Sequence, residues 1–223
     1  SDNFMQKILV GNYASVAMSS TGQYQICCLN YNSFGVSGFA NLFISNNFGL
    51  NWMPIIFGAN NDNNNTYFNN VCISSTGQYI YIGRYDTDNY LTTDTIFMSS
   101  NYGASFSKIA PNNNKYLINN IAISANGQYI NIVGINPNNS ANVMLTSINF
   151  GTTWNLLNTA PNVLFKNICM SANGQYLTGC VNQSAIYNSV TPYINISISN
   201  NLIVYSDVSL NSRLFLGGPV FQF

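Results

Sequence analysis

One segment occurs four times along the chain, and this repetition constrains the fold more than any other feature. The copies read ASVAMSSTGQYQICCL, NNVCISSTGQYIYIG, NNIAISANGQYINIVG and KNICMSANGQYLTGC. Their shared GQY places glycines at Gly22, Gly77, Gly127 and Gly174, so the spacings are 55, 50 and 47 residues. A period of this length is typical of repeat architectures.

Each repeat is built from short runs in which apolar and polar residues alternate. Runs such as VCIS, GQYIYIG and TIFMSS are rich in Ile, Val, Tyr and Phe, and Gly, Asn and Ser clusters separate them. Period-two alternation between turn residues predicts β-strands, and no segment shows a helical period. The GQY glycine falls between the first two strands, where a tight turn favours a positive φ. We therefore expect four antiparallel strands per repeat.

A second signature, S-x-N-x-G-x-x-[WF], joins the third and fourth predicted strands. It resembles the Asp-box, S-x-D-x-G-x-x-W, of bacterial-neuraminidase-type and sortilin-type β-propeller repeats, with Asn in place of Asp. The resemblance implies a folding role with an aromatic side chain packed between blades, and no catalytic role. Its residues are Ser45, Asn47, Gly49 and Trp52, then Ser99, Asn101, Gly103 and Phe106, then Ser147, Asn149, Gly151 and Trp154.

The repeats predict an all-β fold, a β-propeller of four four-stranded blades over residues 4–193. The last repeat, 166–193, has only three predicted strands and no box. The segment Phe4–Val10 aligns with a fourth strand, so we expect it to complete the last blade and close the ring. A five-bladed ring and a ring completed by another chain are the alternatives. The predicted domains are 1–193 and a β tail, 194–223.

The tail contains SDVSLNSRLFLGG, Ser206 to Gly218. This segment resembles one unit of the short repeats in fibre-like structural proteins of large DNA viruses and some phage tail fibres. The resemblance implies a stalk formed by several chains, with a homotrimer as the first expectation and the propeller as its head. The alternative is an ordinary hairpin packed on the propeller.

Composition excludes several classes of partner. Only 5% of residues are charged, and there is no His or Glu. Six scattered cations do not form the basic patch that nucleic acid requires, so no nucleic-acid partner is expected. No run reaches the roughly 18 apolar residues of a membrane helix, so no membrane insertion is expected. Most polar residues are Asn, with roughly forty copies, together with Ser and Thr. This neutral polar composition either suits dense packing on a particle or reflects an AT-rich genome.

The residues needed for glycoside chemistry are largely missing. Sialidases of the resembled family use an arginine triad, a Tyr–Glu pair and an Asp, whereas this chain has only Arg84 and Arg213 and no Glu. Asp86, Asp88 and Asp94 share one predicted loop and cannot easily flank a sugar from two sides. The same loop lacks the Gly and Glu of an EF-hand. We therefore predict no enzyme activity, no catalytic residue, no metal and no cofactor.

The five Cys residues predict reduced thiols. Cys72 and Cys169 align with Ala17 and Ala122 in the other repeats, and a position that accepts Ala or Cys is usually small, buried and apolar. Reduced thiols indicate folding in a reducing compartment. The sequons at Asn64, Asn138, Asn182 and Asn195 point the other way, although they are expected by chance in so Asn-rich a chain.

The sequence as a whole favours a non-enzymatic head domain of a virion or fibre protein that attaches to a glycan or host surface. We expect it on a virion surface or an extracellular fibre, with the cytoplasm as the alternative. The segments 58–70 and 110–120 are rich in Asn, contain one Tyr each and are predicted to meet on one face, as glycan contacts or as solvated loops. The alternatives are a sialidase-like enzyme and an intracellular scaffold for protein partners.

Overall fold

A computed structural model describes residues 12–29, 42–55, 68–84, 96–114, 116–158, 160–181 and 185–189. The chain divides into two compact units, Ser1–Tyr193 and Ile194–Phe223, and every described residue belongs to the first. The predicted closing strand Phe4–Val10 and the whole tail lie outside the described residues.

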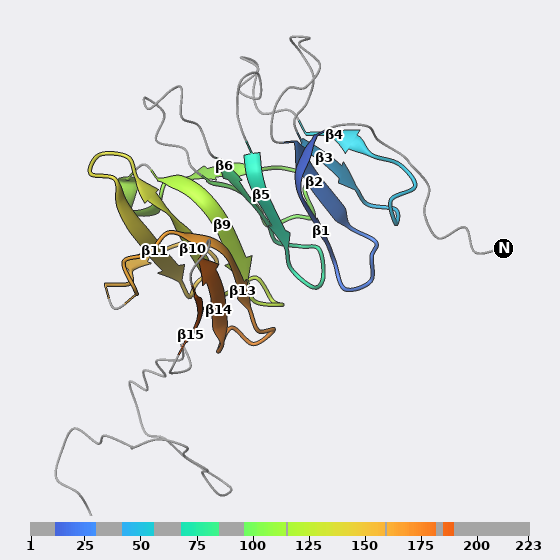
Figure 1. Cartoon of the computed structure of the whole chain (residues 1–223). Helices are drawn as coiled ribbons and strands as arrows, with labels where there is room; N and C mark the ends of the chain where they lie inside the picture. Colours follow the sequence, from blue (N-terminus) through green and yellow to red (C-terminus); the bar gives the residue numbers. More distant parts are fainter. Residues whose placement is uncertain are drawn as a thin grey trace, which may run out of the picture. The chain divides into compact units, whose positions relative to one another are not determined.

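The described chain forms four antiparallel sheets that follow one another in sequence (Figure 1). Blade 1 contains β1 (Tyr13–Met18), β2 (Gln25–Leu29), β3 (Leu42–Ser45) and β4 (Met53–Pro54). Blade 2 contains β5 (Phe68–Ile73), β6 (Ile80–Arg84), β7 (Ile96–Ser99) and β8 (Ser107–Ile109). Blade 3 contains β9 (Leu117–Ile123), β10 (Ile130–Asn136), β11 (Ala141–Ser147) and β12 (Asn155–Leu156). Blade 4 contains β13 (Phe165–Met170), β14 (Leu177–Val181) and β15 (Ile186–Asn188).

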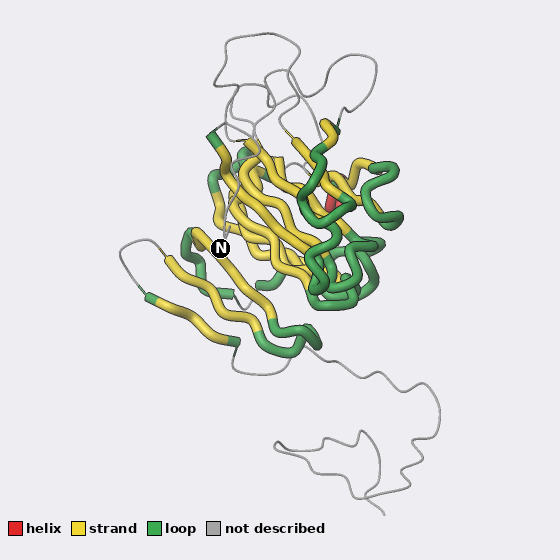
Figure 2. Tube along the Cα trace, turned by 90° about the vertical axis from the view of Figure 1, so that its right-hand side faces the viewer, coloured by secondary structure: helices red, strands yellow, loops and turns green. Residues whose placement is uncertain are grey.

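This architecture confirms the predicted all-β fold with blades arranged as a β-propeller. Strands are almost the only regular structure in the described residues, and the exception is the 3-10 turn Pro111–Asn113 (Figure 2). Each blade pairs its strands in chain order, as expected for a meander of hairpins. The described residues of blade 4 form three strands, which matches the strand count predicted for the last repeat.

The GQY turns explain why the first two strands of every blade pair in the same register. All four glycines have a positive φ, between 75° and 85°, a conformation that costs Gly little. In each turn a serine hydroxyl accepts the N–H of the GQY tyrosine, for example Tyr79 N to Ser74 Oγ at 3.0 Å and Tyr176 N to Ser171 Oγ at 2.9 Å. The conserved residue spacing of the turn therefore produces a conserved hydrogen-bond pattern.

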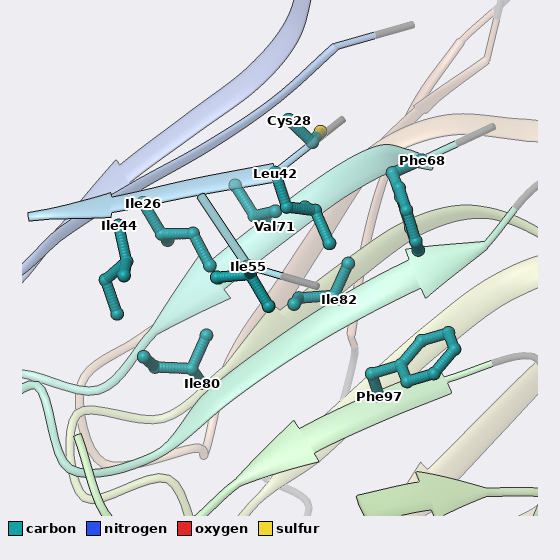
Figure 3. Packing of buried hydrophobic residues seen from close by; sticks show 10 residues of the cluster. All are labelled: Ile26, Cys28, Leu42, Ile44, Ile55, Phe68, Val71, Ile80, Ile82 and Phe97. Atoms are coloured by element: carbon teal, nitrogen blue, oxygen red, sulfur yellow. The ribbon is translucent and has the colours of Figure 1, made fainter. Parts of the chain in front are cut away.

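The core lies between successive blades. The described residues contain three clusters of buried apolar side chains, one for each adjacent pair of blades. Figure 3 shows the cluster between blades 1 and 2, where Ile26, Leu42 and Ile44 face Phe68 and Ile82. Removal of this apolar surface from water is the main force that joins the blades.

Asparagines on the first strand of a blade, here called its inner strand, add hydrogen bonds between blades. The N–H of Ile121 donates to Asn70 Oδ1 of blade 2 at 2.9 Å, and the N–H of Ile168 donates to Asn120 Oδ1 of blade 3 at 3.1 Å. In blade 1 a serine occupies the position, and the Val71 N–H donates to Ser15 Oγ at 3.3 Å. Both asparagines are buried, so these bonds satisfy backbone groups that water does not reach.

Candidate binding surface

The antiparallel strands give every blade two different ends. The GQY turns and the turns between third and fourth strands share one end, the turn end. The connections between blades and between second and third strands share the other, the loop end. This follows from the strand order, because successive hairpins alternate ends.

At the turn end, the S-x-N-x-G motifs form three closely similar hydrogen-bonded turns. In blade 3, Ser147 Oγ donates to Asn149 Oδ1 at 3.1 Å and accepts the Gly151 N–H at 2.9 Å. Asn149 Oδ1 also accepts the Thr153 N–H at 2.9 Å. The motifs that begin at Ser45 and Ser99 repeat these bonds. Their side chains are used to build the turn.

In two of the motifs the asparagine uses both the oxygen and the nitrogen of its side-chain amide. Asn101 Nδ2 donates to Ser105 Oγ at 2.8 Å, and Asn149 Nδ2 donates to Thr153 Oγ1 at 2.9 Å. An ionised carboxylate could only accept hydrogen bonds, so Asn adds a donor that Asp would lack.

Two of the three aromatic residues of these motifs, Trp154 and Phe106, pack between blades, and Trp52 is half-buried in blade 1. Trp154 belongs to the cluster between blades 2 and 3, and its Nε1 donates to Gly151 O at 2.9 Å. Phe106 packs against the cluster between blades 1 and 2. The aromatic residue directly before the motif glycine packs on a GQY tyrosine of the previous blade. The ring centroids are 5.0 Å apart for Tyr24–Tyr102 and 4.8 Å apart for Tyr79–Phe150.

The loop end presents exposed amides on blade 3. Asn112, Asn113 and Asn114 are all exposed in the connection that leads to β9. Asn138 and Asn139 are exposed in the turn between β10 and β11. Backbone groups of this turn bond to asparagine side chains, as in Ala141 N to Asn139 Oδ1 at 3.0 Å. Amide groups can donate and accept at once, so these exposed asparagines offer neutral hydrogen-bonding groups.

The aromatic residues expected to accompany these amides lie elsewhere. Tyr116, within the predicted contact segment 110–120, is only 5% exposed and belongs to the cluster between blades 2 and 3. Phe68, in the segment 58–70, is fully buried. These two rings are therefore not exposed for contact with a sugar, because their positions at strand starts direct them into the core. Residues 58–67 lie outside the described residues.

The candidate charged residues are mostly outside the described part of the chain. Asp86, Asp88, Asp94 and Arg213 all lie there, whereas Arg84 ends β6 and is half-buried. Among the described residues, no cluster of three His, Cys, Asp or Glu occurs. Among the same described residues, no helix has the length and apolar character needed to span a lipid bilayer.

The thiols fall into two groups. Cys27 and Cys28 are buried in β2, and burial raises the pKa of each to about 12, with the neighbouring Cys27 adding to the rise at Cys28. Burial also raises the pKa of Cys72. Cys169 and Cys180 are exposed. The predicted core position of Cys169 is therefore wrong, because no described blade covers that side of blade 4, whereas the aligned Ala122 faces blade 4 and is buried.

Sequence reasoning missed the bonds of Asn70 and Asn120 between blades. The signal was present, since Ser15, Asn70, Asn120 and Asn167 occupy one position of the repeat. A polar residue before a β-branched one fits the period-two alternation of a strand and does not by itself indicate a bond to another blade. Only the neighbouring blade shows what the amide binds.

The comparisons with known proteins support the fold. No family model matches the chain, and no curated protein matches it. Among solved structures, it resembles the GH74 xyloglucanase of Xanthomonas campestris, with 9% identity, a TM-score of 0.60 and coverage of 81% of this chain and 28% of that one. It also resembles the Niastella koreensis GH74 enzyme, with 12% identity, a TM-score of 0.62 and coverage of 82% and 30%. A nidogen/laminin complex gives 11% identity, a TM-score of 0.52 and coverage of 76% and 56%.

The chain spans less than a third of the length of the two GH74 enzymes. At these identities the likeness is one of fold, and the neighbours are β-propellers of glycoside hydrolase family 74 and other proteins. The chain is thus a β-propeller.

Proposed function

We propose that this propeller is a non-enzymatic binding head of a virion or fibre protein and that its loop end contacts a glycan. The observation that supports this most is the set of exposed amides on blade 3, at Asn112–Asn114 and at Asn138 and Asn139. Neutral amides bond to sugar hydroxyls in both directions. The fold resemblance to GH74 enzymes agrees with a carbohydrate ligand.

The absence of Glu from the whole sequence supports binding without hydrolysis. Glycoside hydrolysis usually uses two carboxylates on opposite sides of the bond. The six Asp of the chain would have to supply both, and Asp86, Asp88 and Asp94 are close together in sequence. The virion or fibre setting rests on the resemblance of 206–218 to fibre repeats, through which we expect the tail to self-associate, with a trimer as the first expectation.

A glycan array that includes xyloglucan oligosaccharides and sialylated glycans tests the proposal when a hydrolysis assay accompanies it. Binding without cleavage is the expected result. Asn114→Ala and Asn138→Ala are expected to weaken binding about fivefold or more, since each removes an exposed amide. Asn155→Ala is the matched control, because Asn155 is an exposed amide on β12.

The results that contradict the proposal are distinct. Cleavage of any glycoside would replace it by the enzyme alternative. Absence of binding to every glycan would favour a scaffold for protein partners. Equal loss of binding in Asn155→Ala and in the two loop-end variants would place the ligand elsewhere.

A further inference from the structure

The same set of contacts joins each of the three adjacent pairs of blades. Residues equivalent to one side of these contacts also occur on blade 1, and residues equivalent to the other side also occur on blade 4, where no described blade faces them. The inner strands follow the order β1, β5, β9, β13 (Figure 1). Among the described residues, blade 1 therefore has one side without a preceding blade, and blade 4 has one side without a following blade. The first-blade face comprises Tyr13, Val16, Met18 and Phe48, and the fourth-blade face comprises Asn167, Cys169, Tyr176 and Ile186.

The apolar contact of the inner strands is the first repeated element. Val71, Ile121 and Ile168 occupy one repeat position, face the preceding blade, and are each 4% exposed. Val16 occupies the same position in blade 1 and is 66% exposed. Val16 and Val71 are the same residue type, so their different exposure follows from the missing preceding blade at Val16 within the described residues.

A backbone hydrogen bond between adjacent GQY turns is the second element. The N–H of Ser20 donates to Ser75 O at 2.9 Å, the N–H of Ser75 to Ala125 O at 2.8 Å, and the N–H of Ala125 to Ala172 O at 2.8 Å. The next bond in this series would run from the Ala172 N–H to the Ser20 carbonyl. Within the described residues both of these groups are unpaired. The donor lies on blade 4 and the acceptor on blade 1.

The packing of the GQY tyrosine is the third element. The rings of Tyr24, Tyr79 and Tyr129 each cover the GQY glycine of the following blade so closely that a Cβ there would collide with the ring. Tyr176 is the fourth such tyrosine and is 58% exposed, while Gly22 has nothing within 4 Å of the place a Cβ would take. The stacking partner that Tyr176 would meet is Phe48, which is 62% exposed.

The inner-strand asparagine is the fourth element. Asn70 and Asn120 accept an N–H from the next blade. Asn167 holds the same position in blade 4 and is exposed, with no side-chain hydrogen bond among the described residues. The group it would accept is the Val16 N–H, which is equivalent to the N–H of Ile121.

Exposed apolar residues concentrate on these two faces. Six of the eleven large hydrophobic side chains that are exposed in the described residues belong to them. Ile186 faces outward from blade 4, because it pairs with Cys180 as Met144 pairs with Val133, and those two pack against blade 4. Concentrated exposed apolar surface is typical of an interaction site.

We propose that the fourth-blade face binds the first-blade face of a second copy of this chain. The occupant is a second copy because each unpaired group on one face has its partner on the other face. The contact is head-to-tail, and such contacts form a closed ring when the rotation allows it and a filament when it does not. Two copies make the smallest closed assembly, in which both pairs of faces are buried.

The mass of the full chain in solution tests the proposal. Association through the two faces alone should give about twice the 24.5 kDa of one chain at micromolar concentration, whereas association through the tail alone should give about three times the mass of one chain. Val16→Lys should weaken association about tenfold or more, because it places a charge in an apolar contact. Leu156→Lys is the matched control, since Leu156 is an exposed apolar residue on β12, away from both faces.

A mixing experiment separates a second copy from closure within one chain. Val16→Lys leaves the fourth-blade face intact, and Ile186→Lys leaves the first-blade face intact. Each variant alone should lose the contact between faces, whereas a mixture should form a one-to-one pair of heads through the one unmodified contact. Tyr176→Ala, a milder change, should weaken association without altering circular dichroism.

Two results would overturn the proposal. One is a wild-type chain that stays monomeric at high concentration, which would mean that the faces meet in one chain or stay free. The other is an assembly that Val16→Lys and Tyr176→Ala leave unchanged, which would assign self-association to another surface, such as the tail.

Discussion

Equivalent residues at a buried and an open blade face differ in whether a neighbouring blade covers them. Ile121 faces blade 2 and is buried, whereas Val16, at the same position of the repeat, faces outward from blade 1 and is exposed. Ala122 and Cys169 form a second such pair, on the opposite side of the inner strand. The difference teaches that a blade's sequence specifies the shape of the blade, while the adjacent blade decides which of its faces becomes core.

The largest expected effect contrasts Ile121→Ala with Val16→Ala. Ile121→Ala removes buried methyl groups and leaves a cavity between blades 2 and 3, so it should lower the free energy of unfolding by about 2 to 4 kcal/mol. Val16→Ala should cost less than about 1 kcal/mol in the monomer, because Val16 is exposed. Urea unfolding at low protein concentration measures both values. Equal costs would show that the two faces do not differ as described.

Alkaline pH should act through the buried thiols. The pKa values of Cys27 and Cys28, raised to about 12 by burial, exceed the value of about 8.5 for an unfolded thiol. Their stabilising contribution is therefore complete below about pH 8.5 and declines as the pH rises toward about 12, by about 1.4 kcal/mol per thiol per pH unit.

Unfolding free energies measured between pH 8 and pH 10 test this expectation. Cys28→Ala should make the decline with pH shallower. Cys169→Ala removes an exposed thiol and should leave the slope unchanged. If both variants retain the wild-type slope, the decline has another source.

Asn120→Ala and Asn167→Ala compare the same amide with and without a following blade. Asn120→Ala leaves the N–H of Ile168 without its acceptor, so it should cost about 1 to 3 kcal/mol. Asn167→Ala should change monomer stability by less than about 0.5 kcal/mol, since Asn167 is exposed. Thermal unfolding is the measurement, and a substantial loss in Asn167→Ala would reveal a partner within the chain.

The smallest expected effect concerns a turn that belongs to one blade only. Ser147→Ala removes the acceptor of the Gly151 N–H and the donor to Asn149, which should cost about 1 kcal/mol. Thr153→Ala removes one exposed bond to Asn149 Nδ2 and should cost a few tenths of that. Chemical unfolding of the two variants gives the ratio. A neutral Ser147→Ala would mean that the strands, and not the motif, fix the turn.

The repeat predicted the local structure well, because its turns are specified by neighbouring residues. Gly77 with Ser74, and Gly103 with Ser99, close their turns through bonds that span no more than five residues. The strand order of each blade followed from the same turns. These features could be predicted since every group that decides them lies within one segment of sequence.

The candidate surface was less predictable. Tyr116 and Phe68 were expected among solvent-exposed loops, yet both are core residues, and Cys169 was expected in the core and is exposed. Each error has one cause: sequence alternation shows that a strand has two faces, and it does not show what covers either face.

The sequence by itself determined that this protein consists of hairpin-joined blades, since a glycine with positive φ and a serine hydroxyl suffice to close each turn. Only the tertiary structure decided which apolar stripes are buried and which asparagines bond across blades. The physical reason is that burial and bonds between blades depend on residues about 50 positions away in sequence, as in the bond between Ile121 N and Asn70 Oδ1. The same dependence leaves Val16 and Tyr176 exposed at the two ends of the series.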